Sequence, residues 1–304
     1  MSRPGWWPSD GVPATLGTTT FDCGSIRWLK VTTRLPNPKP FAMPYWEHML
    51  ELRGTRIRVL RGGSGPPLIF LHGASGHVGW LPFLDTLSQR FDAIVPEHPG
   101  FGASDDPSWL DRPADLAYFY LDLIEHLHLD RVHLIGTSLG GWIAAELAIR
   151  NTSRLASLTL VCAVGVTPKG AAMEDVFRMS PEEHARRFYF DPDRVRRRLD
   201  AVAKADPRML VRNRSTVVRL CYPDFINPEL SKWLHRIDIP TLLIWGANDG
   251  LVPLSVGEAY RALMPRARLT VLPQAGHAPY EEEPEAFLQA FDDFLTSSKT
   301  TAPG

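Results

Sequence analysis

The stretch RVHLIGTSLGGWIAAELAIR, residues 131–150, carries the strongest structural signal in the chain. Its first six residues form a short apolar run, which is typical of strands buried on both faces of a parallel sheet. Its last twelve have the length and composition of a helix. Between them, Gly136-Thr137-Ser138-Leu139-Gly140 matches the pattern G-x-S-x-G. In a strand–turn–helix context, the flanking glycines leave room for a sharp turn that exposes the serine hydroxyl. The stretch therefore predicts such a turn, with Ser138 as a candidate nucleophile.

The same alternation of apolar runs and helical stretches extends along most of the chain. Short apolar runs bounded by Gly or Pro lie at residues 66–73, 91–98, 131–136, 155–164, 241–247 and 267–272. Helical stretches lie at residues 78–90, 113–128, 139–150, 256–263 and 284–295. Upstream, residues 48–54 and 56–62 alternate in polarity around a Gly-Thr turn and predict a hairpin. Strands that alternate with helices of this length indicate right-handed βαβ units. We therefore predict an α/β fold with a doubly wound, mostly parallel sheet of eight strands, the first two antiparallel.

The alternation stops over residues 163–238, where several helical pieces occur and no strand is expected. An insertion of roughly 75 residues between two strands is too long for an ordinary loop. We expect it to form an all-helical cap over the C-terminal edge of the sheet, where ligands bind in open α/β folds. The core would then consist of residues 45–162 and 239–297. Residues 1–44, which are rich in proline, would form an N-terminal extension, and residues 298–304 a C-terminal tail.

A serine nucleophile needs a base, and the base needs an acid that orients it. His277 is the candidate base because it lies in a Gly-flanked loop after the last predicted strand. Asp249 is the candidate acid because it lies in a turn directly after the seventh predicted strand. Some folds of this type place the acid one strand earlier, but no carboxylate follows that strand here. Glu281, Glu282 and Glu283 are interpreted as acidic residues that complement the dipole of the last helix.

Three further motifs accompany the serine turn, and together the four resemble the α/β-hydrolase fold superfamily. HGASG at residues 72–76 resembles the oxyanion loop of that superfamily, and HPGFGAS at residues 98–104 resembles its P-G-x-G-x-S turn. GANDGLVP at residues 246–253 resembles its G-x-x-D-x-x-V-P acid loop. The order of serine, acid and histidine along the chain also matches. The resemblance covers residues 46–297.

The resemblance implies how the site would work. The backbone N–H groups of Ala74 and Leu139 would form an oxyanion hole, which stabilises the negative oxygen of a tetrahedral intermediate. No cofactor is implied. Ser138 excludes the branches that use aspartate at this turn, namely haloalkane dehalogenases and epoxide hydrolases. The carbon–carbon bond hydrolases of aromatic ring-cleavage pathways use serine, but they typically carry Trp after the catalytic histidine, whereas Ala278 follows His277 here.

The helical insertion and the oxyanion loop also supply candidate substrate contacts. Phe177, Tyr189 and Tyr222 are among the aromatic residues that we expect to face Ser138. The hydroxyl of Ser75 is a further candidate. The His and Cys residues show no spacing typical of a metal site, so no metal is expected.

Composition and charge bear on partners and location. The chain has 304 residues, of which 44% are hydrophobic, enough for a sizeable core. Its net charge of −1 gives no global field for nucleic acid or an anionic membrane, so neither is an expected partner. No apolar run approaches the ~18 residues that span a bilayer. The odd, widely separated cysteines, Cys23, Cys162 and Cys221, argue against a disulfide framework, and a cytoplasmic location is expected. The arginines within residues 194–198 are interleaved with aspartates, which favours a solvated helix face over recruitment of an acidic substrate.

The sequence thus predicts a serine hydrolase, most specifically a carboxylesterase that acts on a small-molecule ester through an acyl-enzyme intermediate. A covered apolar pocket under the cap would favour short-to-medium acyl chains or small aromatic groups. The nearest alternative is a carbon–carbon bond hydrolase. An alternative of another class is a non-catalytic ligand receptor on the same fold, which would have no need to retain the whole catalytic set. The sequence leaves a monomer and a homo-oligomer equally open.

Overall fold

The apolar runs of the sequence pair side by side into one sheet. In the computed structural model, which describes residues 45–76, 79–168 and 175–300, this sheet has eight strands in the order β1-β2-β4-β3-β5-β6-β7-β8. Their bounds are β1 Tyr45–Leu52, β2 Thr55–Gly62, β3 Pro67–Leu71, β4 Asp92–Pro96, β5 Val132–Thr137, β6 Leu155–Val161, β7 Thr241–Gly246 and β8 Ala267–Leu272. The pairs β1–β2 and β2–β4 are antiparallel, and all later pairs are parallel. The predicted eight-stranded, mostly parallel sheet is confirmed.

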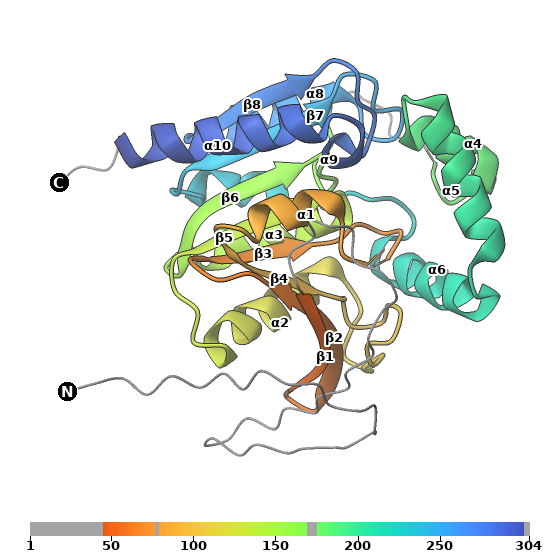
Figure 1. The fold of residues 1–304 in the computed structure, drawn as a ribbon, viewed down its shortest axis with the longest axis horizontal. Helices are drawn as coiled ribbons and strands as arrows, with labels where there is room; N and C mark the ends of the chain where they lie inside the picture. The colour runs from red at the N-terminus through yellow and green to blue at the C-terminus, as the bar shows by residue number, and fades with distance from the viewer. Residues whose placement is uncertain (1–44, 77–78, 169–174, 301–304) are drawn as a thin grey trace, which may run out of the picture.

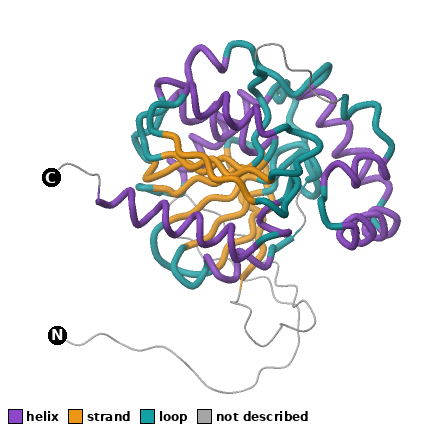
Figure 2. Tube along the Cα trace, turned by 90° about the horizontal axis from the view of Figure 1, so that it is seen from above, coloured by secondary structure: helices purple, strands orange, loops and turns teal. Residues whose placement is uncertain are grey.

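Helices cover both faces of the sheet, as Figure 2 shows. On one face, α1 (Pro82–Leu87), α9 (Pro279–Glu282) and α10 (Pro284–Thr300) contact one another. On the other face lie α2 (Pro113–His126), α3 (Leu139–Arg150) and α8 (Leu254–Leu263). The strands between these layers are buried on both sides, and every residue of β7 is buried. This double burial explains why the strands appear in the sequence as continuous apolar runs.

Three helices of the insertion lie beyond the carboxyl ends of the parallel strands, at the right of Figure 1. They are α4 (Pro181–Phe188), α5 (Pro192–Lys204) and α6 (Pro207–Cys221). Each begins with proline directly after a residue whose side chain caps the helix, namely Ser180, Asp191 and Asp206. Proline at the first helical position and a Ser or Asp cap are both strong helix-start signals, so the sequence sets these boundaries locally.

The last part of the insertion returns to the core. At its base, the N–H of Gly165 donates to Phe225 O and the N–H of Asn227 donates to Gly165 O, both at 2.8 Å. The following helices α7 (Leu230–Trp233) and η1 (Leu234–Arg236) bury Leu230 and Leu234, and η1 packs against α3. Residues 227–236 of the predicted insertion therefore pack against the core, although the predicted boundary lies at 238.

Two other boundaries differ from the prediction. α1 is confined to residues 82–87 of the predicted helix over 78–90, because Pro82 occupies its first turn. α10 continues to Thr300, into the segment predicted as a tail from residue 298. The predicted extension over residues 1–44 lies outside the described residues. No helix in the described part of the chain combines the length and the apolar character needed to cross a membrane.

Candidate active site

Ser138 lies at the sharp turn between β5 and α3. Its φ of 53° and ψ of −116° form a conformation that residues with a Cβ rarely adopt. The Ser138 N–H donates to Val161 O at 2.9 Å and holds the turn against β6. A Cβ on Gly140 would lie 2.2 Å from Leu71 O, so only glycine allows the turn to approach β3 this closely. The predicted strand–turn–helix around Ser138 is confirmed.

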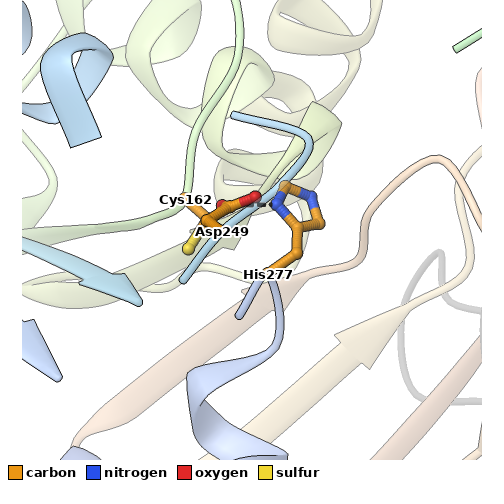
Figure 3. Close-up of side chains that lie close together, drawn as sticks. All are labelled: Cys162, Asp249 and His277. Carbon is orange, nitrogen blue, oxygen red and sulfur yellow. Dashed lines mark hydrogen bonds and ion pairs between the residues drawn. The ribbon is translucent and has the colours of Figure 1, made fainter. Parts of the chain in front are cut away.

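Asp249 and His277 form a buried hydrogen-bonded pair (Figure 3), with 2.7 Å between Nδ1 of His277 and Oδ2 of Asp249. The other carboxylate oxygen of Asp249 accepts the N–H groups of Leu251 and Val252, both at 2.9 Å. The carboxylate is thus fixed by the turn that follows β7. A proton on Nδ1 satisfies the bond to Asp249 and leaves a lone pair on Nε2 of His277, which is the form a general base requires.

Cys162 lies beside this pair (Figure 3) and connects it to the serine turn. Its sulfur, a carboxylate oxygen of Asp249 and a ring nitrogen of His277 all lie within 4.8 Å of one another. Ser138 bonds through its backbone to the residues on both sides of Cys162, since its N–H donates to Val161 O and its carbonyl accepts from the Val164 N–H at 3.3 Å. The serine turn follows β5, Cys162 follows β6, and the loops of Asp249 and His277 follow β7 and β8, so all four lie along the carboxyl ends of four consecutive strands of the sheet.

The thiol of Cys162 is uncharged beside Asp249 and His277. Burial raises the pKa of its thiol well above the usual value, and the neighbouring charge of Asp249 raises it further. The thiol therefore stays protonated at neutral pH and is a poor nucleophile and metal ligand. Asp249 and His277 already use their facing atoms in the hydrogen bond between them. Sequence analysis missed Cys162, although its place at the end of β6 matches the alternative strand position considered for the acid.

The predicted oxyanion loop lies against Ser138. A Cβ built on Gly73 would lie 3.2 Å from Ser138 Cβ, which places the next residue, Ala74, beside the turn. Leu139 is the first residue of α3, so its N–H has no acceptor within the helix. Both residues proposed for the oxyanion hole therefore lie next to Ser138 or its loop contact, and the direction of their N–H groups toward a substrate oxygen stays a prediction. Ser75, the predicted hydroxyl contact, is exposed.

Two buried histidines hold the oxyanion loop. The His98 N–H donates to Nε2 of His72 at 3.0 Å, and Nε2 of His98 donates to His72 O at 2.8 Å. The Tyr120 hydroxyl donates to Nδ1 of His98. Burial lowers the pKa of His72 to about 4, so its ring is neutral at pH 7 and can accept the bond from His98. His72 is therefore a structural residue of this loop.

The end of α4 reaches both loops that carry the acid and the base. The His277 N–H donates to Phe188 O at 2.7 Å, and the Gly250 N–H donates to Arg187 O at 3.0 Å. The ring of Phe188 also stands edge-on to the imidazole of His277, with 5.0 Å between centroids. A segment of the insertion is thus built into the candidate site.

Glu282 also connects the insertion to the loop that carries His277, and we call this contact region the joint between insertion and core. One of its carboxylate oxygens accepts the N–H groups of Phe190 at 2.8 Å and Asp191 at 2.9 Å. The other accepts the N–H of Gly276, the residue before His277, at 2.6 Å. The interpretation of Glu282 as a helix-dipole residue was therefore incomplete. Nothing in the local sequence signals this role, because the bonded segments lie about 90 residues apart.

The structure separates the predicted aromatic contacts into two places. Tyr189 is buried and its hydroxyl donates to Glu281 at 3.2 Å, so it lies in the joint between insertion and core. Phe177 stacks on Phe225 with 5.3 Å between centroids, and Tyr222 stands edge-on to Phe177 at 5.7 Å. Tyr222 itself is 69% exposed. A role for these residues in substrate binding stays a prediction.

Comparison with known proteins gives consistent results. Residues 68–290 match the model of the alpha/beta hydrolase family. The chain is 30% identical over 256 residues to the pimeloyl-[acyl-carrier protein] methyl ester esterase of Nitrosomonas europaea, a match that covers 78% of this chain and 98% of that protein. It is 27% identical over 271 residues to the 2-hydroxymuconate semialdehyde hydrolase of a Pseudomonas species, covering 82% and 93%. Among solved structures, a bacterial membrane phospholipase A matches with a TM-score of 0.71 and 28% identity, covering 85% of this chain and 87% of that one.

Proposed function

The chain belongs to the alpha/beta hydrolase family, and from this we propose that it is a serine hydrolase that cleaves carboxylic esters through an acyl-enzyme intermediate. The observation that carries the proposal is the buried hydrogen bond between Asp249 and His277, and the strained turn of Ser138 supports it. The similarity to a methyl ester esterase supports an ester as the substrate.

The proposed reaction begins with attack of Ser138 Oγ on the ester carbonyl carbon while Nε2 of His277 accepts the hydroxyl proton. The carbonyl oxygen becomes negative and accepts hydrogen bonds from the N–H groups of Leu139 and Ala74. As the tetrahedral intermediate collapses, His277 returns the proton to the departing alkoxide, and the acyl group stays on the serine. Water, deprotonated by His277, then attacks the acyl-enzyme, and the carboxylic acid leaves as Ser138 regains its proton.

Asp249 orients the base in this scheme. Its two backbone donors fix the carboxylate, and its bond to Nδ1 holds the His277 ring with Nε2 free for the serine. The negative charge of Asp249 also stabilises the imidazolium that forms when His277 accepts the proton. The protonated thiol of Cys162 adds no charge beside the pair.

For the substrate we propose esters with short-to-medium acyl chains or small aromatic groups, with the helical insertion acting as a cap. The aromatic cluster of Phe177, Tyr222 and Phe225 offers apolar surface on the insertion. Each buried CH₂ gains ~0.8 kcal/mol, so kcat/KM should rise with chain length until the available surface is covered.

A carbon–carbon bond hydrolase is the second candidate, because several relatives are named as hydrolases of dienoates. The absence of Trp after His277 counts against this candidate.

A single panel of substrates separates the candidates. We would measure kcat/KM for p-nitrophenyl esters from acetate to palmitate and for a ring-cleavage dienoate, with the Ser138→Ala variant as the blank. The proposal expects esters to be preferred, with an optimum at or below medium chain length. A dienoate preferred over every ester would establish the second candidate. A value still rising at palmitate would overturn the proposed chain-length limit. Turnover of both the esters and the dienoate no faster than the blank would favour the non-catalytic receptor.

A further inference from the structure

The cationic charge of the chain is concentrated on two helices of the insertion. Residues 192–221, which form α5, α6 and the turn between them, contain nine Lys and Arg residues and three Asp residues, a net charge of +6. The whole chain carries −1, so the remaining residues carry −7. The expectation that no anionic membrane is bound used only the whole-chain value. The distribution along the chain gives this segment the opposite sign to the rest, and some of its arginines, including Arg194, Arg196 and Arg219, pair with carboxylates.

The turn between these helices also exposes apolar side chains. We call residues 204–211 the insertion tip. Met209 is 44% exposed, Leu210 39% and Val211 66%. The exposed charged residues beside them are Lys204, Asp206 and Arg208, and Asp206 caps the helix. Apolar side chains exposed side by side at the start of a helix are in unfavourable contact with water. Exposed apolar patches mark interaction sites on protein surfaces.

The fold explains why these side chains are uncovered. On α6, Thr216, Val217 and Leu220 are buried against the core. Met209 and Leu210 lie two turns earlier on the same face of the helix as Thr216 and Val217, and both are exposed. Figure 1 shows the turn between α5 and α6 at the outer rim of the molecule, on the side opposite the end of α10.

The arrangement of the apolar residues distinguishes between partners. Successive residues on a helix are about 100° apart, so Met209, Leu210 and Val211 together span about 200° of its circumference. A protein surface that docks on one side of the helix would cover only part of this arc. The interfacial region of a bilayer surrounds an inserted helix end on all sides, and its anionic headgroups complement Lys204 and Arg208.

We propose that the insertion tip docks on an anionic lipid surface, with Met209, Leu210 and Val211 inserted to the level of the acyl chains and Lys204 and Arg208 at the phosphates. Long cationic side chains reach headgroups while their stems stay in the apolar layer. Because the tip belongs to the helices that flank the candidate site, docking would bring the site to the membrane surface. The proposal concerns binding and does not depend on which bond the enzyme cleaves.

The test is sedimentation of the full chain with vesicles of phosphatidylcholine alone or with phosphatidylglycerol added. We expect the wild type to bind the anionic vesicles, and binding to neutral vesicles to be weaker by at least about 10-fold. The variant Met209→Ser/Leu210→Ser/Val211→Ser should bind anionic vesicles about 100-fold more weakly. The matched control Val271→Ser, which removes an exposed valine on β8, should bind as the wild type does. The circular dichroism spectrum and the urea midpoint should be the same in all three proteins, which shows that each is folded.

The remaining outcomes each overturn the proposal. If the wild type stays in the supernatant with anionic vesicles, the tip does not bind lipid, and an acidic protein becomes the candidate partner for its basic and apolar residues. Equal binding by the wild type and the triple serine variant would place lipid binding elsewhere on the chain. If light scattering shows a wild-type dimer that the triple variant converts to a monomer, and neither binds vesicles, the tip is an interface between two copies of this chain.

Discussion

Replacement of Glu282 by alanine should weaken both the attachment of the insertion and the loop that carries His277. The Glu282 carboxylate accepts three backbone N–H groups, those of Phe190, Asp191 and Gly276. The alanine variant leaves all three donors to find water or to stay unpaired. Because these donors come from both sides of the joint, we expect a loss of stability together with a loss of activity.

The size of the effect follows from the three contacts. A hydrogen bond to a charged group contributes ~1.5–3 kcal/mol, and an accessible donor recovers part of this from water. Glu282 is only partly buried, so Glu282→Ala should lower the free energy of unfolding by about 2–4 kcal/mol in total. Glu282→Gln keeps one acceptor oxygen but turns an amide N–H toward the other donors, and should lose about half as much. A shift of the His277 loop by a fraction of an ångström should lower kcat by about 10–100-fold.

The assay is urea unfolding followed by circular dichroism at pH 7, together with kcat on p-nitrophenyl butyrate. Glu285→Ala is the matched control, because Glu285 is an exposed carboxylate in the first turn of the next helix. The reasoning is refuted if Glu282→Ala unfolds within about 0.5 kcal/mol of this control and keeps its kcat, since the three bonds would then hold nothing in place.

Three other variants test separate parts of the site and its surroundings. Asp249→Asn should fold normally, as judged by its urea midpoint, but lose ~10⁴ in kcat, because the ring of His277 is no longer held in the required tautomer; near-normal turnover would mean that another group orients the base. Cys162→Ser should keep kcat within about twofold at pH 7, since the buried thiol is protonated; a loss of ~10³ or more would instead make the sulfur a participant. The pKa values of His48, His72 and His184 are each lowered to about 4, chiefly by burial. Below pH 6.5 these histidines therefore bind protons in the unfolded chain but not in the folded chain. Their contribution to the free energy of unfolding is fully present above pH 6.5. It should fall by up to about 4 kcal/mol per pH unit as the pH drops toward 4. His72→Asn should reduce this slope, measured from urea midpoints at pH 7, 6 and 5, by about a third, and an unchanged slope would show that His72 titrates normally.

The arrangement of the sheet was predictable because its strands are buried on both faces. Such strands show as unbroken apolar runs, and the lengths of chain between them fix the crossover helices. The triad candidates Ser138, Asp249 and His277 could be chosen by position, since the carboxyl ends of parallel strands meet at one edge of the sheet. Local chemistry, in the form of glycines, turns and caps, was sufficient for these elements.

What the sequence did not reveal depends on long-range packing. The helices from Leu230 to Arg236 look like the rest of the insertion, yet Leu230 and Leu234 are buried in the core. A helical pattern shows which face of the helix is apolar, but not whether the core or the rest of the insertion packs against that face. In the same way, the bonds from Glu282 to Phe190 and Asp191 join segments that no local pattern connects.

The most direct test of the central claim is covalent labelling of the nucleophile. The native protein would be treated with a fluorophosphonate probe, digested, and analysed by mass spectrometry, with Ser138→Ala treated in parallel. We predict a single modified residue, Ser138, with loss of ester turnover in proportion to labelling, and neither labelling nor turnover in the variant. Labelling at another residue, or turnover that survives in Ser138→Ala, would contradict the account.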